Sequence, residues 1–164
     1  ILDIGTGSGC IPITIAKMAK NVEVTTLDVS DKAIEVAKKN AQDLGVNISF
    51  INQSILETEV LDLYDIIVSN PPYVRNLEKV EIKNNVLIHE PHLALFVEDD
   101  DPLIFYRKIV SLAENSLKSN GYLFFEINQY LGKETFDLFN KHFTNVELRK
   151  DFVGNDRMIR GMKV

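Results

Sequence analysis

An amide, two prolines and an aromatic ring stand together at residues 70–73, where the sequence reads Asn-Pro-Pro-Tyr. The apolar run at residues 65–69 directly precedes them and is typical of a buried strand. Two prolines end such a strand, because neither has an N–H to continue a ladder. Asn70 and Tyr73 should therefore lie at the carboxyl end of a strand, where open α/β sheets bind ligands. An amide acceptor beside a flat ring suits a planar nitrogen nucleophile.

A second candidate site is the glycine-rich segment at residues 3–9, Asp-Ile-Gly-Thr-Gly-Ser-Gly. Glycines allow a tight turn and a close approach to a ligand, and the helix expected next offers free N–H groups. The dinucleotide pattern would need a third glycine where Cys10 stands, and the Gly-Lys-Ser/Thr of a P-loop is absent. Asp28 ends the next expected strand, the usual position of a carboxylate that binds ribose hydroxyls. The alternative is purely structural: the glycines make a turn and Asp28 caps a helix.

Alternating strands and helices are expected to position these residues. Hydrophobic patterns and end signals predict strands at 1–4, 22–28, 47–52, 65–69, 122–127, 145–150 and 157–164, and helices at 9–20, 31–44, 102–118 and 132–142. Ser30 is the expected N-cap and Gly45 the stop of the second helix, and Pro102 is expected in the first turn of the third.

This element order predicts an α/β fold, with a doubly wound, mostly parallel, Rossmann-like seven-stranded sheet and helices on both faces. The last two strands should form a C-terminal antiparallel hairpin, because the loop at 151–156 is too short for a crossover.

Length and composition indicate one domain over residues 1–164. The net charge is −6 and basic residues do not cluster, so direct nucleic-acid binding is not expected. The single cysteine, Cys10, fits a reducing, cytoplasmic compartment and is expected in the core. No apolar stretch reaches the about 18 residues of a membrane span. The chain begins inside a strand-like segment without Met, which suggests a truncated first strand; a monomer is expected.

The glycine segment, the strand-end acid and Asn-Pro-Pro-Tyr together resemble the S-adenosylmethionine-dependent methyltransferases of the seven-stranded fold (class I). Flanking sequences narrow the resemblance to the protein-(glutamine-N5) methyltransferases of peptide chain release factors, the PrmC/HemK family. These further matches are Ile67 to Val74, Glu90-Pro91, Ala94-Leu95, Phe105-Tyr106-Arg107, Gly121, Glu126-Ile127 and Asp156-Arg157. The resemblance covers essentially the whole chain, although the tetrapeptide alone also occurs in adenine-N6 DNA methyltransferases.

The resemblance implies S-adenosyl-L-methionine as cofactor, with S-adenosyl-L-homocysteine as product, and a peptide chain release factor as partner. The cofactor contacts that it implies are Asp3, Gly5, Thr6, Gly7, Ser8, Gly9, Asp28, Ser54, Ile55 and Asn70. Asp3 would orient the loop or meet the cofactor's amino group, Asp28 would hold the ribose, and Ser54 and Ile55 would flank the adenine. The substrate contacts that it implies are Asn70, Pro71, Pro72, Tyr73 and Glu90, of which Asn70, Pro71 and Tyr73 would be catalytic.

The sequence departs from the family pattern at several positions. Ser54 or Ile55 stands where many members have an acid, Asn128 replaces a common glycine, and the acidic stretch 98–101 replaces a glycine-containing loop. Family members also carry an N-terminal helical domain that helps to dock the protein substrate, and this sequence is expected to contain only the catalytic domain.

No metal site is expected, because His89 and His92 do not form a His-Glu-x-x-His pattern and Pro91 interrupts a helix. The resemblance implies methyl transfer to the side-chain amide nitrogen of a glutamine in a release factor. Three alternatives stay open: a glutamine methyltransferase of a ribosomal protein, an adenine-N6 nucleic-acid methyltransferase, and a cofactor-binding domain that is inactive without its docking domain.

Overall fold

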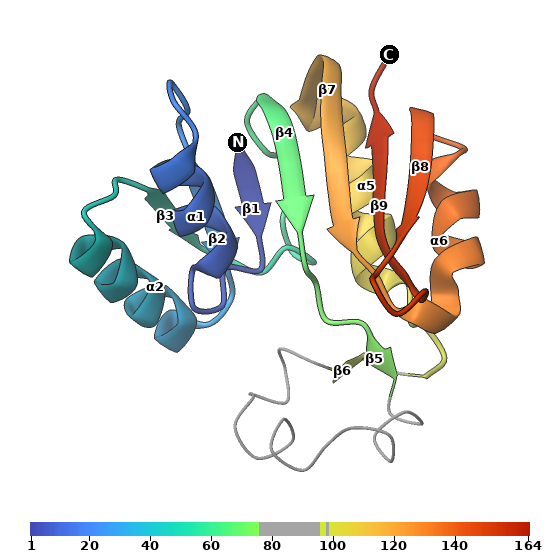
Figure 1. The fold of residues 1–164 in the computed structure, drawn as a ribbon, viewed down its shortest axis with the longest axis horizontal. Coiled ribbons are helices and arrows are strands. Elements are labelled where there is room, and N and C mark those ends of the chain that lie inside the picture. Colours follow the sequence, from blue (N-terminus) through green and yellow to red (C-terminus); the bar gives the residue numbers. More distant parts are fainter. Residues whose placement is uncertain (76–95, 98) are drawn as a thin grey trace.

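The computed structural model describes residues 1–75, 96–97 and 99–164. Seven strands form one sheet: β1 (Leu2–Ile4), β2 (Thr25–Asp28), β3 (Ser49–Asn52), β4 (Tyr64–Ser69), β7 (Leu117–Glu126), β8 (Thr144–Lys150) and β9 (Asp156–Met162). Their order is β3-β2-β1-β4-β7-β9-β8 (Figure 1). The strands from β3 to β7 pair in parallel, and β9 is antiparallel to both β7 and β8. The predicted doubly wound sheet and its C-terminal hairpin are confirmed.

Among the described residues, four α-helices flank the sheet, and a smaller element lies outside it (Figure 1). The helices are α1 (Cys10–Met18), α2 (Asp31–Leu44), α5 (Ile104–Ser116) and α6 (Gly132–Phe139), with the 3-10 helix η2 (Gln129–Leu131) before α6. A two-stranded parallel sheet, which was not predicted from the sequence, consists of β5 (Val74–Arg75) and β6 (Phe96–Val97). Because β5 directly follows the Asn-Pro-Pro-Tyr turn, the chain leaves the main sheet at that turn.

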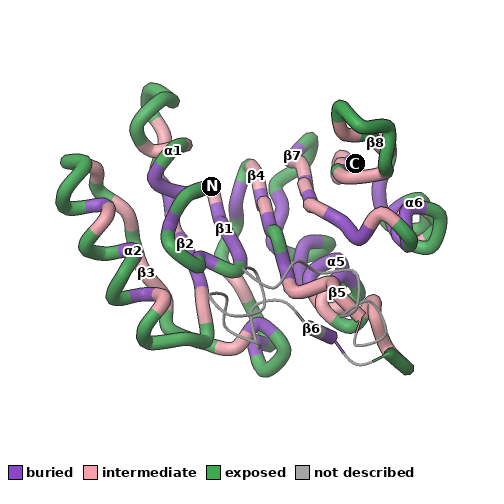
Figure 2. The backbone as a smooth tube through the Cα atoms, turned by 60° about the horizontal axis from the view of Figure 1, so that its bottom comes forward, coloured by how far each residue is buried: buried purple, intermediate pink, exposed green. Residues whose placement is uncertain are grey.

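The main hydrophobic core lies between the sheet and the pair α5 and α6. Side chains of β1, β4 and β7 point into it, including the fully buried Leu2, Ile67 and Leu123. The helices α1 and α2 contact each other beside β1 to β3 (Figure 1). Along α2 single buried residues alternate with exposed ones, as expected of an amphipathic surface helix (Figure 2).

The ends of α2 agree with the sequence. Ser30 Oγ accepts a hydrogen bond from Ala33 N at 3.3 Å, so Ser30 is the N-cap. Gly45 adopts φ 65° at the other end, where its N–H bonds to the last carbonyls. Both predicted signals are confirmed.

The predicted end of the third helix is wrong. The helix α5 ends at Ser116, and β7 begins at Leu117 instead of after Asn120-Gly121. Leu117 is fully buried and pairs with Tyr64, so tertiary packing takes this residue into the strand. Pro102 also lies outside the first turn, because the N-cap is Leu103. Within the described residues, no helix is long and apolar enough to cross a membrane.

Candidate functional site

The sheet register brings the two candidate segments to one edge. Ile4 at the end of β1 pairs with Leu27 on one side and with Ser69 on the other. The chain therefore leaves the sheet side by side after β1 and after β4 (Figure 1), and the residues that follow these strands are Gly5 and Asn70. A Cβ atom placed on Gly5 would lie 3.5 Å from the backbone oxygen of Asn70. The structure thus joins segments that are about 65 residues apart in the sequence.

The glycine loop uses backbone conformations that favour glycine. Gly5, Gly7 and Gly9 have φ values of 88°, 52° and 84°, all in the left-handed region. A Cβ atom on Gly9 would also lie 2.7 Å from Ile13 Cδ1 and 3.1 Å from Ala37 Cβ. Gly5 and Gly7 are exposed whereas Gly9 is buried, so the first two glycines present the loop backbone and the third packs it onto the helices.

Asp28 holds the loop from the end of β2. Its Oδ2 accepts from Gly7 N at 2.9 Å and its Oδ1 accepts from Ser30 N at 2.8 Å. The carboxylate is half-buried, and each oxygen keeps a second lone pair. Asp28 can therefore fix the loop and still accept hydrogen bonds from the hydroxyls of a ligand.

The structure adds a contact at Ser8 and corrects the position of Cys10. Ser8 is exposed, and its carbonyl accepts from Asn40 Nδ2 of α2 at 2.9 Å, a contact that the sequence analysis missed. Cys10 is exposed, so its predicted place in the core is wrong. As the first residue of α1, Cys10 has no preceding helical turn to cover it.

Asp3 is fully buried beneath the loop, in the middle of β1. Its Oδ2 accepts from the Thr26 hydroxyl at 2.6 Å, while its Oδ1 has no hydrogen-bond partner. Burial raises the pKa of Asp3 to about 7; the Thr26 hydrogen bond opposes this shift and the charge of Asp28 adds to it. Thr6 is also buried, and its hydroxyl lies 2.6 Å from that of Thr26.

Ser54 and Ile55 follow β3, and their side chains differ in exposure. Ser54 is half-buried, and its carbonyl accepts from Thr58 Oγ1 at 2.8 Å. Ile55 is 7% exposed and its side chain belongs to the main core. Adenine contacts by these two residues stay a prediction.

The Asn-Pro-Pro-Tyr turn is fixed by the next strand of the sheet. Asn70 is exposed, Pro71 is buried, and Pro72 and Tyr73 are half-buried. The Tyr73 hydroxyl donates to Glu126 Oε1 at 2.7 Å, at the end of β7. Burial, together with the nearby Glu126 carboxylate, raises the pKa of Tyr73. The ring is thus tied to β7, and its packing against a substrate amide stays a prediction.

Asn128 is a site residue whose role the sequence analysis missed. Its Nδ2 donates to the Tyr73 carbonyl at 2.9 Å, and its Oδ1 accepts from Tyr130 N at 2.9 Å. The sequence showed this residue only as a departure from a common glycine. The signal that could have found it is its place directly after a buried strand, where an amide can clamp a neighbouring turn. Glu90 lies outside the described residues.

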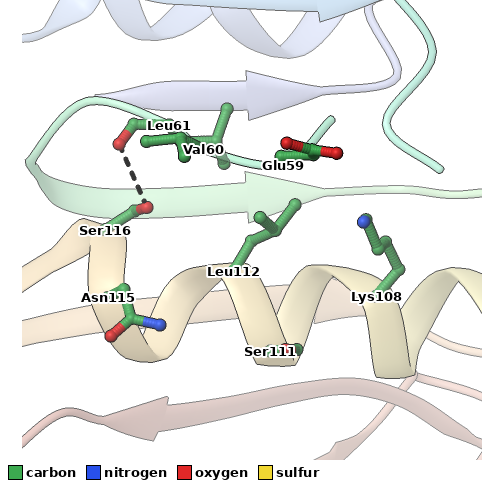
Figure 3. Close-up of a pocket in the computed structure, with 8 residues that line it drawn as sticks. All are labelled: Glu59, Val60, Leu61, Lys108, Ser111, Leu112, Asn115 and Ser116. Carbon is green, nitrogen blue, oxygen red and sulfur yellow. Dashed lines mark hydrogen bonds between the residues drawn. The ribbon is translucent and has the colours of Figure 1, made fainter. Parts of the chain in front are cut away.

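A separate pocket of about 330 Å³ lies between α5 and the segment before β4 (Figure 3). Its lining residues are Glu59, Val60, Leu61, Lys108, Ser111, Leu112, Asn115 and Ser116. Ser116 Oγ donates to the Leu61 carbonyl at 3.3 Å across one end of it (Figure 3). None of the residues singled out from the sequence lines this pocket, so it is distinct from the glycine-loop site.

The strand order, the reversed β9 and the glycine loop at the carboxyl edge define the fold of class I methyltransferases. A crystal structure of ribosomal protein L11 methylase from Lactobacillus delbrueckii subsp. bulgaricus aligns over 99% of this chain and 69% of that one, with a TM-score of 0.70 at 19% identity. The family model described as "Methyltransferase small domain" matches residues 1–98. The chain therefore belongs to the methyltransferase small domain family.

Two curated relatives are similar over almost the whole chain. A release factor glutamine methyltransferase of Flavobacterium psychrophilum is 63% identical over 162 residues, which cover 98% of this chain and 57% of the relative. One from Bacteroides thetaiotaomicron is 43% identical and covers 97% of this chain and 58% of the relative. The chain thus spans somewhat more than half the length of these relatives.

Proposed function

We propose that this chain is the catalytic part of an enzyme that transfers a methyl group from S-adenosylmethionine to the side-chain amide nitrogen of a glutamine in a peptide chain release factor. The reaction would take place in the cytoplasm, on a protein partner, with the chain acting as a monomer. The observation that carries the proposal is the closeness of Gly5 to Asn70 at one sheet edge. The two similar relatives, both named release factor glutamine methyltransferase, support the choice of substrate.

The donor side has the groups that S-adenosylmethionine requires. Asp28 can accept from ribose hydroxyls while it holds Gly7, and the exposed backbone of Gly5 and Gly7 leaves room for the methionine part. The unpaired Oδ1 of Asp3 is a buried acceptor that suits an ammonium group. When bound, the cofactor supplies a methyl group already activated by its sulfonium.

The acceptor side must position a weak nucleophile, because the lone pair of an amide nitrogen is delocalised into its carbonyl. The Asn70 side-chain oxygen and the Pro71 carbonyl would accept the two N–H bonds of the glutamine. They would fix the nitrogen toward the donor and stabilise the positive charge that develops on it. A strong general base is unnecessary if the proton leaves to water after transfer. Tyr73, tied to Glu126, would limit the position of the flat amide.

Methyl transfer from labelled S-adenosylmethionine tests the proposal directly. The natural full-length protein is incubated with a release factor, with a ribosomal protein fraction and with DNA. We expect label in the release factor at one glutamine, and none after that glutamine is replaced by Ala. Label on DNA but not on protein would overturn the proposal. Calorimetry of the present chain with S-adenosylhomocysteine tests the donor side by itself, and absence of binding would count against the glycine loop as its site.

A further inference from the structure

Three buried polar side chains form a chain of hydrogen bonds beneath the glycine loop. Asp3 and Thr26 are 0% exposed and Thr6 is 4% exposed. Thr26 Oγ1 lies 2.6 Å from Asp3 Oδ2 and 2.6 Å from Thr6 Oγ1. Asp3 and Thr26 are register partners on β1 and β2, so their side chains share one face of the sheet. Thr26 thereby connects the buried acid to Thr6 of the loop.

Counting hydrogens fixes the direction of this chain. A threonine hydroxyl has one hydrogen to donate. When Asp3 is ionised, Thr26 donates to it, so Thr6 must donate to Thr26. The Thr6 hydrogen then points inward, below the loop. When Asp3 carries a proton on Oδ2, the acid donates to Thr26 and Thr26 donates to Thr6. The Thr6 hydroxyl hydrogen then no longer points to Thr26 and can be donated to another acceptor. The same heavy-atom positions thus allow two hydrogen-bond directions, and the charge of Asp3 selects between them.

A cationic ligand would favour the hydrogen-bond direction in which Asp3 is ionised. Asp3 Oδ1 is buried without a partner, which is costly for a carboxylate. A ligand ammonium that reaches this oxygen would remove that cost and would favour the ionised acid. The Thr26 hydroxyl favours the same form, because it donates to the other oxygen.

Among the described residues near Asp3, few charged groups affect its ionisation. Among the described residues, the ionisable group on β2 that acts on Asp3 is Asp28, whose Oδ2 holds Gly7 of the same loop. On the other side, β4 places Val68 opposite Asp3 and Ser69 after it, and neither ionises. On α1, Lys17 donates to the carbonyl of Leu44.

We propose that Thr26 is a positioning residue that favours the ionised form of Asp3 by donating to its Oδ2, and thereby strengthens the binding of a cationic ligand at Asp3 Oδ1. The inference rests on the proposed S-adenosylmethionine site and adds a residue and a pH dependence to it. Binding should tighten as pH rises, because the ligand prefers the ionised acid. Near neutral pH, where Asp3 changes charge, each unit that its pKa moves upward weakens binding by up to tenfold.

The test is calorimetry of S-adenosylhomocysteine binding between pH 5.5 and 8.5, with the wild-type chain, Thr26→Ser and Thr26→Val. We expect wild-type affinity to rise with pH to a plateau. Thr26→Val, which lacks the hydroxyl, should shift the midpoint of this rise upward, and a midpoint one pH unit higher would weaken binding at pH 7 by roughly fivefold. Thr26→Ser should restore the wild-type midpoint.

A matched control is Thr135→Val. Thr135 is also 0% exposed, but its hydroxyl donates to the Leu131 carbonyl near α6, away from the loop. This variant should lose stability without moving the midpoint. If Thr26→Val folds poorly, Thr26→Ala serves as the variant without a hydroxyl, and ¹³C NMR titration of the Asp3 carboxyl compares it with the wild-type chain, with and without ligand. The ligand should lower the Asp3 pKa in both.

The outcomes separate the inference from the proposed function. Binding that does not change with pH, or an equal midpoint in Thr26→Val and wild type, would overturn the role of Thr26 and leave the proposed function standing. Absence of binding at every pH would overturn the donor site, and the inference with it.

Discussion

The two halves of the candidate site are held in different ways. The donor half, residues 3–9 with Asp28, is fixed by hydrogen bonds among neighbouring elements of the β1-α1-β2 unit, above and below the loop. The acceptor half, residues 70–73, is fixed by long-range contacts, because Tyr73 and its carbonyl bond to Glu126 and Asn128 more than 50 residues later. The first half is preorganised by its own unit, and the second depends on β7 packing beside β4.

This comparison predicts that the two halves can be damaged separately. Asn70→Ala should reduce methyl transfer by roughly 100-fold to 1,000-fold, as does removal of one positioned transition-state partner in other enzymes. Binding of S-adenosylhomocysteine should change little, because the donor half keeps its own hydrogen bonds. Turnover by the full-length protein and calorimetry measure the two effects.

Asn115→Ala is the matched control, since Asn115 is an exposed amide on α5 beside the separate pocket (Figure 3). Near wild-type turnover in Asn70→Ala would remove Asn70 from the proposed mechanism.

Asp3→Asn tests the cost of the buried acid in the donor half. The folded-state pKa of Asp3 is about 7, above the ordinary value of 3.8 for an aspartate, so the unfolded chain releases this proton at lower pH. The contribution of Asp3 therefore lowers the free energy of unfolding as pH rises from about 4 to 7, and is constant above that range. Asp3→Asn should remove roughly 3 kcal/mol of this decrease between pH 5 and pH 8.

Urea unfolding at the two pH values measures the difference between variant and wild type. Asp43→Asn, on the exposed side of α2, should keep the wild-type slope. If the free energy of unfolding of Asp3→Asn changed with pH as in the wild type, Asp3 would not be the group that causes this change.

Glycine substitutions divide the donor loop into a packing part and a ligand part. Gly9→Ala should lower the free energy of unfolding by about 2 kcal/mol or more, because its φ of 84° disfavours a side chain and the new Cβ would meet Ile13 and Ala37. Gly7→Ala meets nothing within 4 Å, so about 1 kcal/mol of backbone strain is expected. Its main effect should be weaker cofactor binding. Equal stability losses in both variants would contradict this division.

The smallest expected effect concerns the hydrogen bond from Tyr73 to Glu126, which holds the acceptor half. Tyr73→Phe removes the hydroxyl that donates to Glu126 and should lower the free energy of unfolding by about 1–2 kcal/mol. It should also raise KM for the release factor, with cofactor affinity preserved. A change in cofactor affinity larger than the change in KM would mean that the two halves are not held independently.

Sequence patterns predicted the local features well, because their causes are local. The cap at Ser30 and the stop at Gly45 follow from hydrogen bonds within a few residues. The strand before Asn70 follows from a β-branched run stopped by two prolines. The end of α5 was predicted wrongly because the burial of Leu117 against β4, and not any local signal, decides where β7 begins.

The sequence by itself determined the seven-stranded α/β fold, the glycine loop, and the place of Asp28 and Asn70 at strand ends. Only the tertiary structure decided how these parts connect. It buried Asp3 with one oxygen unpaired, linked it through Thr26 to Thr6, and tied Tyr73 to Glu126 and Asn128. The physical reason is that strand register selects which distant side chains become neighbours. Burial then determines the strength of their hydrogen bonds and the charge of Asp3.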